Sequence, residues 1–213
     1  MIIVKENLSI FGENIEEEIL KQICTQYLTV KEFFEEKEEL QIRIILCSNK
    51  EELKFFSGLD EIGESTTGRA IISENIIVMY TPKAIEENTP KKKENFRGIL
   101  AHEITHLFYN KRGYPQKLQV INEGLASYIQ WVVVNKKEFN EEPDLNNFNL
   151  LQEYSRNIYK EGLYLINYLI KKAEKSALFE FLEKIKYFKD QEILMEFNKL
   201  LDIKLKGGIN QDD

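Results

Sequence analysis

Cysteine is scarce in this chain of 213 residues, which contains only two, Cys24 and Cys47. Two cysteines are too few for a small fold held together by disulfides. Both lie within apolar stretches, KQICTQYL and IRIILCSN, where a free cysteine packs as a small hydrophobic residue. We therefore expect two buried free thiols, although a bridge between them stays open at this point.

Long apolar runs and an excess of positive charge are also missing. No segment approaches the roughly 20 apolar residues of a membrane helix, and the start, MIIVKENLS, lacks a signal-peptide core. The formal net charge is -7, from 29 basic and 36 acidic residues, whereas a protein that binds duplex nucleic acid needs a basic face. The run Lys91–Lys93 is expected to be a solvated loop. We expect a cytoplasmic protein, unless a leader was removed, that binds neither nucleic acid nor membranes.

The order of the predicted elements indicates an α+β fold, with strands first and helices afterwards. Helical spacing occupies residues 13–40, a buried strand residues 40–48, and two strands GRAIIS and NIIVMYTP. A lysine-rich loop, 83–95, precedes the next helix. Further helices are expected at 118–137, 151–173, 176–187 and 190–201, with a loop at 140–149 and a frayed tail. We expect one domain, residues 1–213, with an N-terminal subdomain (1–112) and a C-terminal helical subdomain (113–213).

Histidine is as scarce as cysteine, yet both histidines stand four residues apart in ILAHEITHLFYN. On a helix, His102 and His106 share one face, and two imidazoles so placed can bind one zinc ion. Glu103 lies about 100° around the helix, beside the metal, where it can act as a general base. Two histidines placed at random would fall four apart only about once in a hundred such chains. The alternative, two packed histidines with a buried carboxylate and no metal, would be costly.

A third ligand must be a carboxylate, because no histidine remains. Glu123 in INEGLASYIQW has apolar neighbours on the next predicted helix, which favours it as a buried ligand. In the alternative interpretation, Asn122 is an N-cap and Glu123 merely begins the helix. Asp144 is a weaker candidate, because EPDLNN resembles an exposed loop.

HEITH followed, after sixteen intervening residues, by the Glu123 of NEGLASY resembles the gluzincin metallopeptidases. The similarity is to bacterial peptidase MA-like proteins and the catalytic domain of M1-type aminopeptidases, over about residues 41–201. It implies a thermolysin-like fold: a small N-terminal mixed sheet with helices, an active-site helix, a C-terminal helical subdomain and a cleft between. It also implies one zinc ion on His102, His106 and Glu123.

Two further segments extend the resemblance. YSRNIYKEGLYLINYL (154–169) is similar to the M1-type segment YxxxxYEKGxxxLxxL, which implies that Tyr159 stabilises an oxyanion; otherwise Tyr154, Tyr159, Tyr164 and Tyr168 are core aromatics. TGRAIISENIIVMY is similar to the strands before the active helix of thermolysin-like folds, which implies substrate contacts at Gly68, Arg69, Ala70 and Ile71. The GAMEN-type motif that binds a free amino terminus is absent.

The expected function is a zinc-dependent hydrolase, an endopeptidase or oligopeptidase acting on a peptide or protein substrate. Glu103 would take a proton from water activated by the metal, and Tyr159 would stabilise the oxyanion. Two alternatives stay open. One is a zinc-stabilised binding or regulatory domain without turnover, and the other is a hydrolase of non-peptide amides. The oligomeric state is not predicted.

Overall fold

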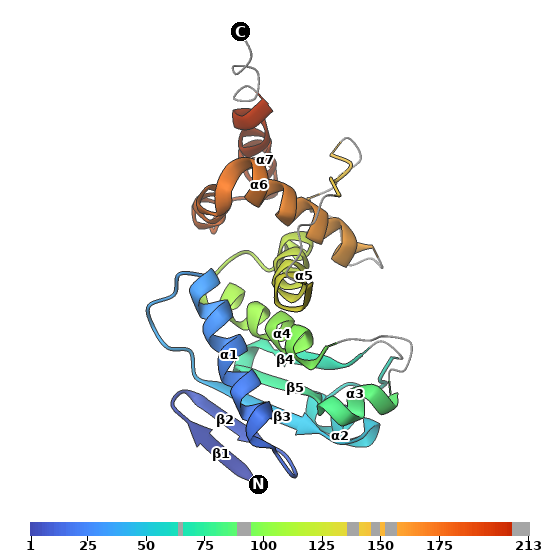
Figure 1. Cartoon of the computed structure of the whole chain (residues 1–213). Coiled ribbons are helices and arrows are strands. Elements are labelled where there is room, and N and C mark those ends of the chain that lie inside the picture. The colour runs from blue at the N-terminus through green and yellow to red at the C-terminus, as the bar shows by residue number, and fades with distance from the viewer. Residues whose placement is uncertain (64–65, 89–94, 136–140, 146–149, 152–156, 206–213) are drawn as a thin grey trace. The chain divides into compact units, whose positions relative to one another are not determined.

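The computed structural model describes residues 1–63, 66–88, 95–135, 141–145, 150–151 and 157–205 (Figure 1). These residues form one five-stranded sheet and seven α-helices, which confirms the α+β class. The chain divides into two compact units, Met1–Lys111 with Ile129–Lys136, and Arg112–Tyr128 with Lys137–Asp213. The first division, after Lys111, lies one residue before the expected boundary at 112, and Ile129–Lys136 is grouped with the first unit.

The first unit contains the sheet, whose strand order is β1-β2-β3-β5-β4. Its strands are β1 (Ile2–Lys5), β2 (Leu8–Phe11), β3 (Ile42–Cys47), β4 (Gly68–Ile71) and β5 (Ile76–Tyr80). The three central strands are parallel, and the two edge strands, β1 and β4, run antiparallel to their neighbours. Parallel neighbours need a crossover, and α1 (Glu17–Phe33) supplies it between β2 and β3.

One face of this sheet packs against two helices, α1 and α4 (Phe96–Lys111), as Figure 1 shows. The strand register places Ile10, Ile44 and Ile77 side by side, and all three are fully buried. Above them, the rings of Phe34 and Phe108 stack with centroids 5.9 Å apart. Burial of this apolar layer, at roughly 25 cal/mol per Å², holds α4 firmly on the sheet.

Four elements of the first unit, α3, the strands β1 and β2, and α2, differ from the sequence-based expectation. The interpretation of residues 83–95 as a loop is wrong over α3 (Pro82–Asn88), whose first turn is capped by the Thr81 hydroxyl accepting from Ala84 N at 3.2 Å. The β1–β2 hairpin and α2 (Lys50–Ser57) were not predicted. The predicted strands in 40–48 and in GRAIIS and NIIVMYTP are confirmed as β3, β4 and β5.

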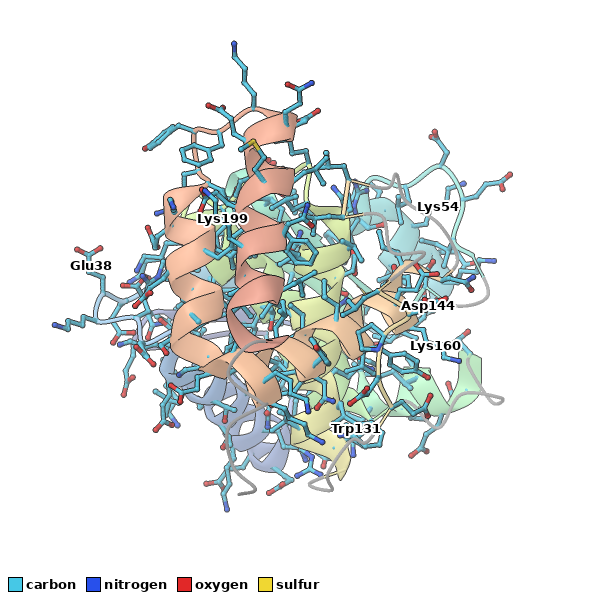
Figure 2. The ribbon with its side chains drawn as sticks, turned by 90° about the horizontal axis from the view of Figure 1, so that it is seen from above. Glu38, Lys54, Trp131, Asp144, Lys160 and Lys199 are labelled. Carbon is cyan, nitrogen blue, oxygen red and sulfur yellow. The ribbon has the colours of Figure 1, made fainter. Side chains whose placement is uncertain are left out.

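The second unit is helical, with the first part of α5 (Gln119–Asn135), α6 (Ile158–Lys184) and α7 (Asp190–Leu205). α6 bends at Glu174, whose φ of 64° and ψ of 154° are not helical, which confirms the predicted break after residue 173. Figure 2 shows the later part of α6 beside α7, which bears Lys199. The predictions for Lys91–Lys93, for Tyr154 and for the GGINQDD tail at 207–213 lie outside the described residues.

A helix that crosses a bilayer needs about 20 consecutive, predominantly apolar residues. None of the described helices contains an apolar stretch long enough to meet this requirement.

Candidate metal centre

The helix α4 carries the two histidines along its least buried side. Asn95 caps its start, with the side-chain oxygen accepting from Arg97 N at 2.9 Å. Around the helix most side chains are buried, but His102, His106 and Asn110 form a half-buried stripe at a spacing of four residues. The imidazoles therefore lie where the helix is accessible, while its remaining surface anchors it in the first unit.

The two imidazoles lie close together and nearly perpendicular to each other. Their ring centroids are 4.8 Å apart and the ring planes make an angle of 82°. This follows from the helix itself, because side chains at i and i+4 lie one above the other on the same face. The arrangement leaves a ring nitrogen of each histidine able to approach a common point.

Glu123 lies inside α5 rather than at its start. The helix begins at Gln119, and the carbonyl of Leu118 accepts from the N–H groups of Ile121 and Asn122. The alternative in which Asn122 is the N-cap is therefore wrong. Glu123 is only 9% exposed, and the stretch 120–126 around it is buried throughout. A carboxylate in such surroundings is costly unless a cation or hydrogen bonds compensate its charge.

The structure brings the three predicted ligands together. One ligand atom from each of His102, His106 and Glu123 lies within 4.8 Å of the other two. Tetrahedral zinc with bonds of 2.0–2.1 Å needs ligand atoms about 3.4 Å apart, so small side-chain rotations would bring this set to bonding distance. Two imidazoles and one carboxylate are also a donor set that zinc accepts. The residues therefore fit a zinc ion, whereas Asp144 is exposed and not in this set.

Glu103 lies on the adjacent side of α4, against the edge strand β4. It is 9% exposed. A Cβ atom on Gly68 would lie 3.4 Å from Glu103 Cγ, an ordinary van der Waals distance, so this strand residue lies directly beside the Glu103 side chain. The carboxylate of Glu103 is thus next to the histidine pair in sequence and next to the sheet edge in space.

The edge strand β4 offers backbone groups on the side away from β5. Tyr80 N donates to Thr67 O at 3.0 Å, which makes this pair hydrogen-bonded, and the register then makes Arg69–Val78 and Ile71–Ile76 hydrogen-bonded as well. The N–H and C=O groups of the intervening residues, Gly68 and Ala70, consequently point outward. Arg69 is occupied elsewhere, since its Nη1 donates to Ser57 O at 2.7 Å.

Tyr159 lies in the first turn of α6 and is 38% exposed. This exposure argues against the alternative in which it is a core aromatic. Tyr164 and Tyr168 further along the helix are half-buried. Tyr159 is thus the most exposed of these three tyrosines of α6.

Three glycines in the helices were not recognised from the sequence. Gly98, Gly124 and Gly162 are places where neighbouring helices approach too closely for a side chain. Glycine within an apolar helical pattern was the available signal, since it costs helix stability and needs a packing reason.

No protein-family model and no curated protein matches the chain. The resemblance to gluzincins therefore stays a prediction. Its support is the identity of the residues in the two motifs and the convergence of His102, His106 and Glu123.

Proposed function

We propose that this protein is a zinc-dependent hydrolase that cleaves peptide bonds, related to the gluzincin metallopeptidases and built on a thermolysin-like arrangement. The observation that carries the proposal is the convergence of two imidazoles and one carboxylate within 4.8 Å. Glu103 follows the first histidine directly, as the HExxH mechanism requires of its base.

In this proposal His102, His106 and Glu123 hold the metal. Zinc bound there would supply a Lewis acid and lower the pKa of a water molecule toward 7. Glu103 accepts the proton of the attacking water and passes it to the leaving amine. Its low exposure, 9%, keeps the carboxylate out of bulk solvent and favours proton transfer over a short distance.

The resemblance also gives Tyr159 and the edge strand β4 a role toward the substrate. The phenol donates a hydrogen bond to the oxyanion as negative charge develops on the substrate carbonyl. The outward backbone groups of Gly68 and Ala70 pair with an extended peptide, which would join the sheet as one more strand. Arg69 and Ile71 direct their backbone groups to β5, so contacts with substrate would come from the Ile71 side chain and from those guanidinium N–H groups of Arg69 that do not donate to Ser57 O.

The two alternatives predict different observations. A structural zinc site closes its coordination sphere with four protein ligands, whereas the described residues bring only three together here. This favours a site with an open position over a silent binding domain. The free edge of β4 favours a peptide over a small amide, because it offers a row of backbone partners.

Zinc content tests the ligand set. Purified protein should contain close to one zinc per chain by elemental analysis, and His106→Ala and Glu123→Ala should each lose it. Asp144→Ala is the matched control, because its carboxylate is exposed and outside the set. Full zinc content in Glu123→Ala would remove the proposed site.

Turnover tests the reaction. Glu103→Gln keeps the size of the side chain but removes the base, so zinc content should stay near one while cleavage falls by about 10³-fold or more. The assay is a mixed library of quenched fluorescent peptides. Undiminished cleavage by this variant would refute the mechanism, and cleavage of small amides alone would favour the non-peptide hydrolase.

A further inference from the structure

Two glycines in the second unit bring the backbones of α5 and α6 into direct contact. A Cβ atom on Gly162 would lie 2.4 Å from Val120 O and 2.7 Å from Gly124 Cα. A Cβ atom on Gly124 would lie 2.5 Å from Gly162 O. Contacts this short do not occur, so any side chain at either position would force the two helices apart.

Each glycine lies next to a residue of the proposed site. Gly124 follows the predicted ligand Glu123 directly, and Gly162 lies one turn after Tyr159. The crossing therefore joins the turn of α5 that carries the carboxylate to the turn of α6 that carries the phenol. We infer that Gly124 and Gly162 are positioning residues, whose backbone contact sets the place of Tyr159 relative to Glu123. The inference rests on the proposed function.

The burial of the two helices indicates which of them would move if a side chain separated their backbones at Gly124 and Gly162. The α5 stretch 120–126 is buried throughout, whereas Tyr159 and Lys160 in the first turn of α6 are exposed. Lys160 is labelled in Figure 2. The last part of α5 belongs to the first unit and packs closely against α4 there. A Cβ atom on Gly98 of α4 would lie 2.6 Å from Val134 Cγ2 of α5. Of residues 158–161 in the first turn of α6 only Ile158 is buried, so this turn, with Tyr159, is held by fewer buried side chains than α5 and is the part expected to move.

The displacement can be derived from the contact distances. A Cβ atom on Gly162 would lie 2.4 Å from Val120 O, and an ordinary contact is about 3.4 Å. The two helices must therefore separate by about 1 Å to accept an alanine at this position. A misplacement of about 1 Å in a catalytic constellation can lower the rate by about 10²-fold. The effect should appear in kcat rather than in KM, because Tyr159 acts on charge that develops only in the transition state.

The first experiment tests the crossing without any assay of activity. Gly124→Ala, Gly162→Ala and the double variant are compared by urea unfolding, with Lys160→Ala as the control from the same turn. Each single variant should be less stable than the wild type, although alanine is the better helix former, and the double variant should be scarcely worse than either. Stabilisation by either alanine, or additive losses, would overturn the inference.

The second experiment follows Tyr159 itself by ¹⁹F NMR of protein labelled with 3-fluorotyrosine, its resonance assigned from Tyr159→Phe. In Gly162→Ala this resonance should shift, while those of Tyr27 and Tyr80 in the first unit stay in place. An unchanged Tyr159 resonance would overturn the inference. Gly124→Ala introduces the same clash from the other helix. If one of the two variants does not fold, the NMR experiment can be done with the other.

Kinetics then separate positioning from a structural effect. Gly162→Ala should keep the zinc affinity of the wild type, measured with zinc alone, and lose at least tenfold in kcat on the peptide library. Adding Tyr159→Phe to it should cost little more, because the phenol is already misplaced. If the losses in kcat caused by Gly162→Ala and by Tyr159→Phe simply multiplied in the double variant, the positioning role would be overturned. A wild type without turnover would instead refute the proposed function, while the unfolding and NMR results would still decide on the contact.

Discussion

Among single residues, the two cysteines show how burial sets reactivity. Both thiols are free. Cys47 ends β3 and is fully buried, and this burial, with the nearby charge of Glu52, raises the pKa of its thiol to about 12. Cys24 on α1 is only half-buried. Because the thiolate is the reactive form, Cys47 is inert at neutral pH.

Alkylation measures this difference. At pH 8 iodoacetamide should modify Cys24 alone, since a thiol with a pKa of about 12 is only about 10⁻⁴ ionised there. Raising the pH increases the thiolate fraction of Cys47, so its slow labelling should quicken as the pH approaches 12. Mass spectrometry of Cys24→Ser before and after unfolding in urea provides the control. Rapid labelling of the native variant at pH 8 would contradict the buried thiol.

Among elements, the edge strand β4 shows how register assigns roles to neighbouring residues. Ala70 directs its N–H outward, whereas Arg69 directs its N–H to Val78 on β5. Proline removes the N–H and is tolerated at an edge only where that group faces away from the sheet. Proline at position 70 should therefore affect the binding of substrate, whereas proline at position 69 should affect the stability of the sheet.

Ala70→Pro should fold, bind zinc and raise KM for peptides by about tenfold, because it removes one outward hydrogen-bond donor of about 1.5 kcal/mol. Arg69→Pro should instead lower the melting temperature, since it removes a hydrogen bond to β5. Thermal unfolding and steady-state kinetics of the pair provide the measurement. Equal KM values for Ala70→Pro and the wild type would show that the substrate does not use this edge.

The unpredicted elements have local causes. In the β1–β2 hairpin the turn residue Glu6 has a φ of 54°, where glycine or asparagine is the usual signal, so the sequence carried no hairpin signature. α2 did carry signals: the Asn49 side chain accepts from Glu52 N at 2.9 Å, and Gly58 ends the helix with a φ of 65°. Its short length and exposed Phe55 and Phe56 concealed the amphipathic pattern.

For the whole molecule, metal binding should appear as thermal stability. A ligand that binds only the folded state at 100 times its Kd stabilises by about 2.7 kcal/mol, which for a chain of this size is about 5–10 °C in Tm. Differential scanning calorimetry with zinc and after chelation should show this difference. His106→Ala, which lacks one ligand, should show none, and an equal shift in that variant would indicate binding elsewhere.

The sequence by itself determined the α+β class, the helical register that aligns His102 with His106, and the buried setting of Glu123, because each depends on spacing and polarity within one segment. Only the tertiary structure decided that Glu123 joins the two imidazoles, that Ala70 rather than Arg69 faces the free edge, and that Gly124 meets Gly162. These depend on contacts between segments distant along the chain, and periodicity within a segment carries no information about its partner.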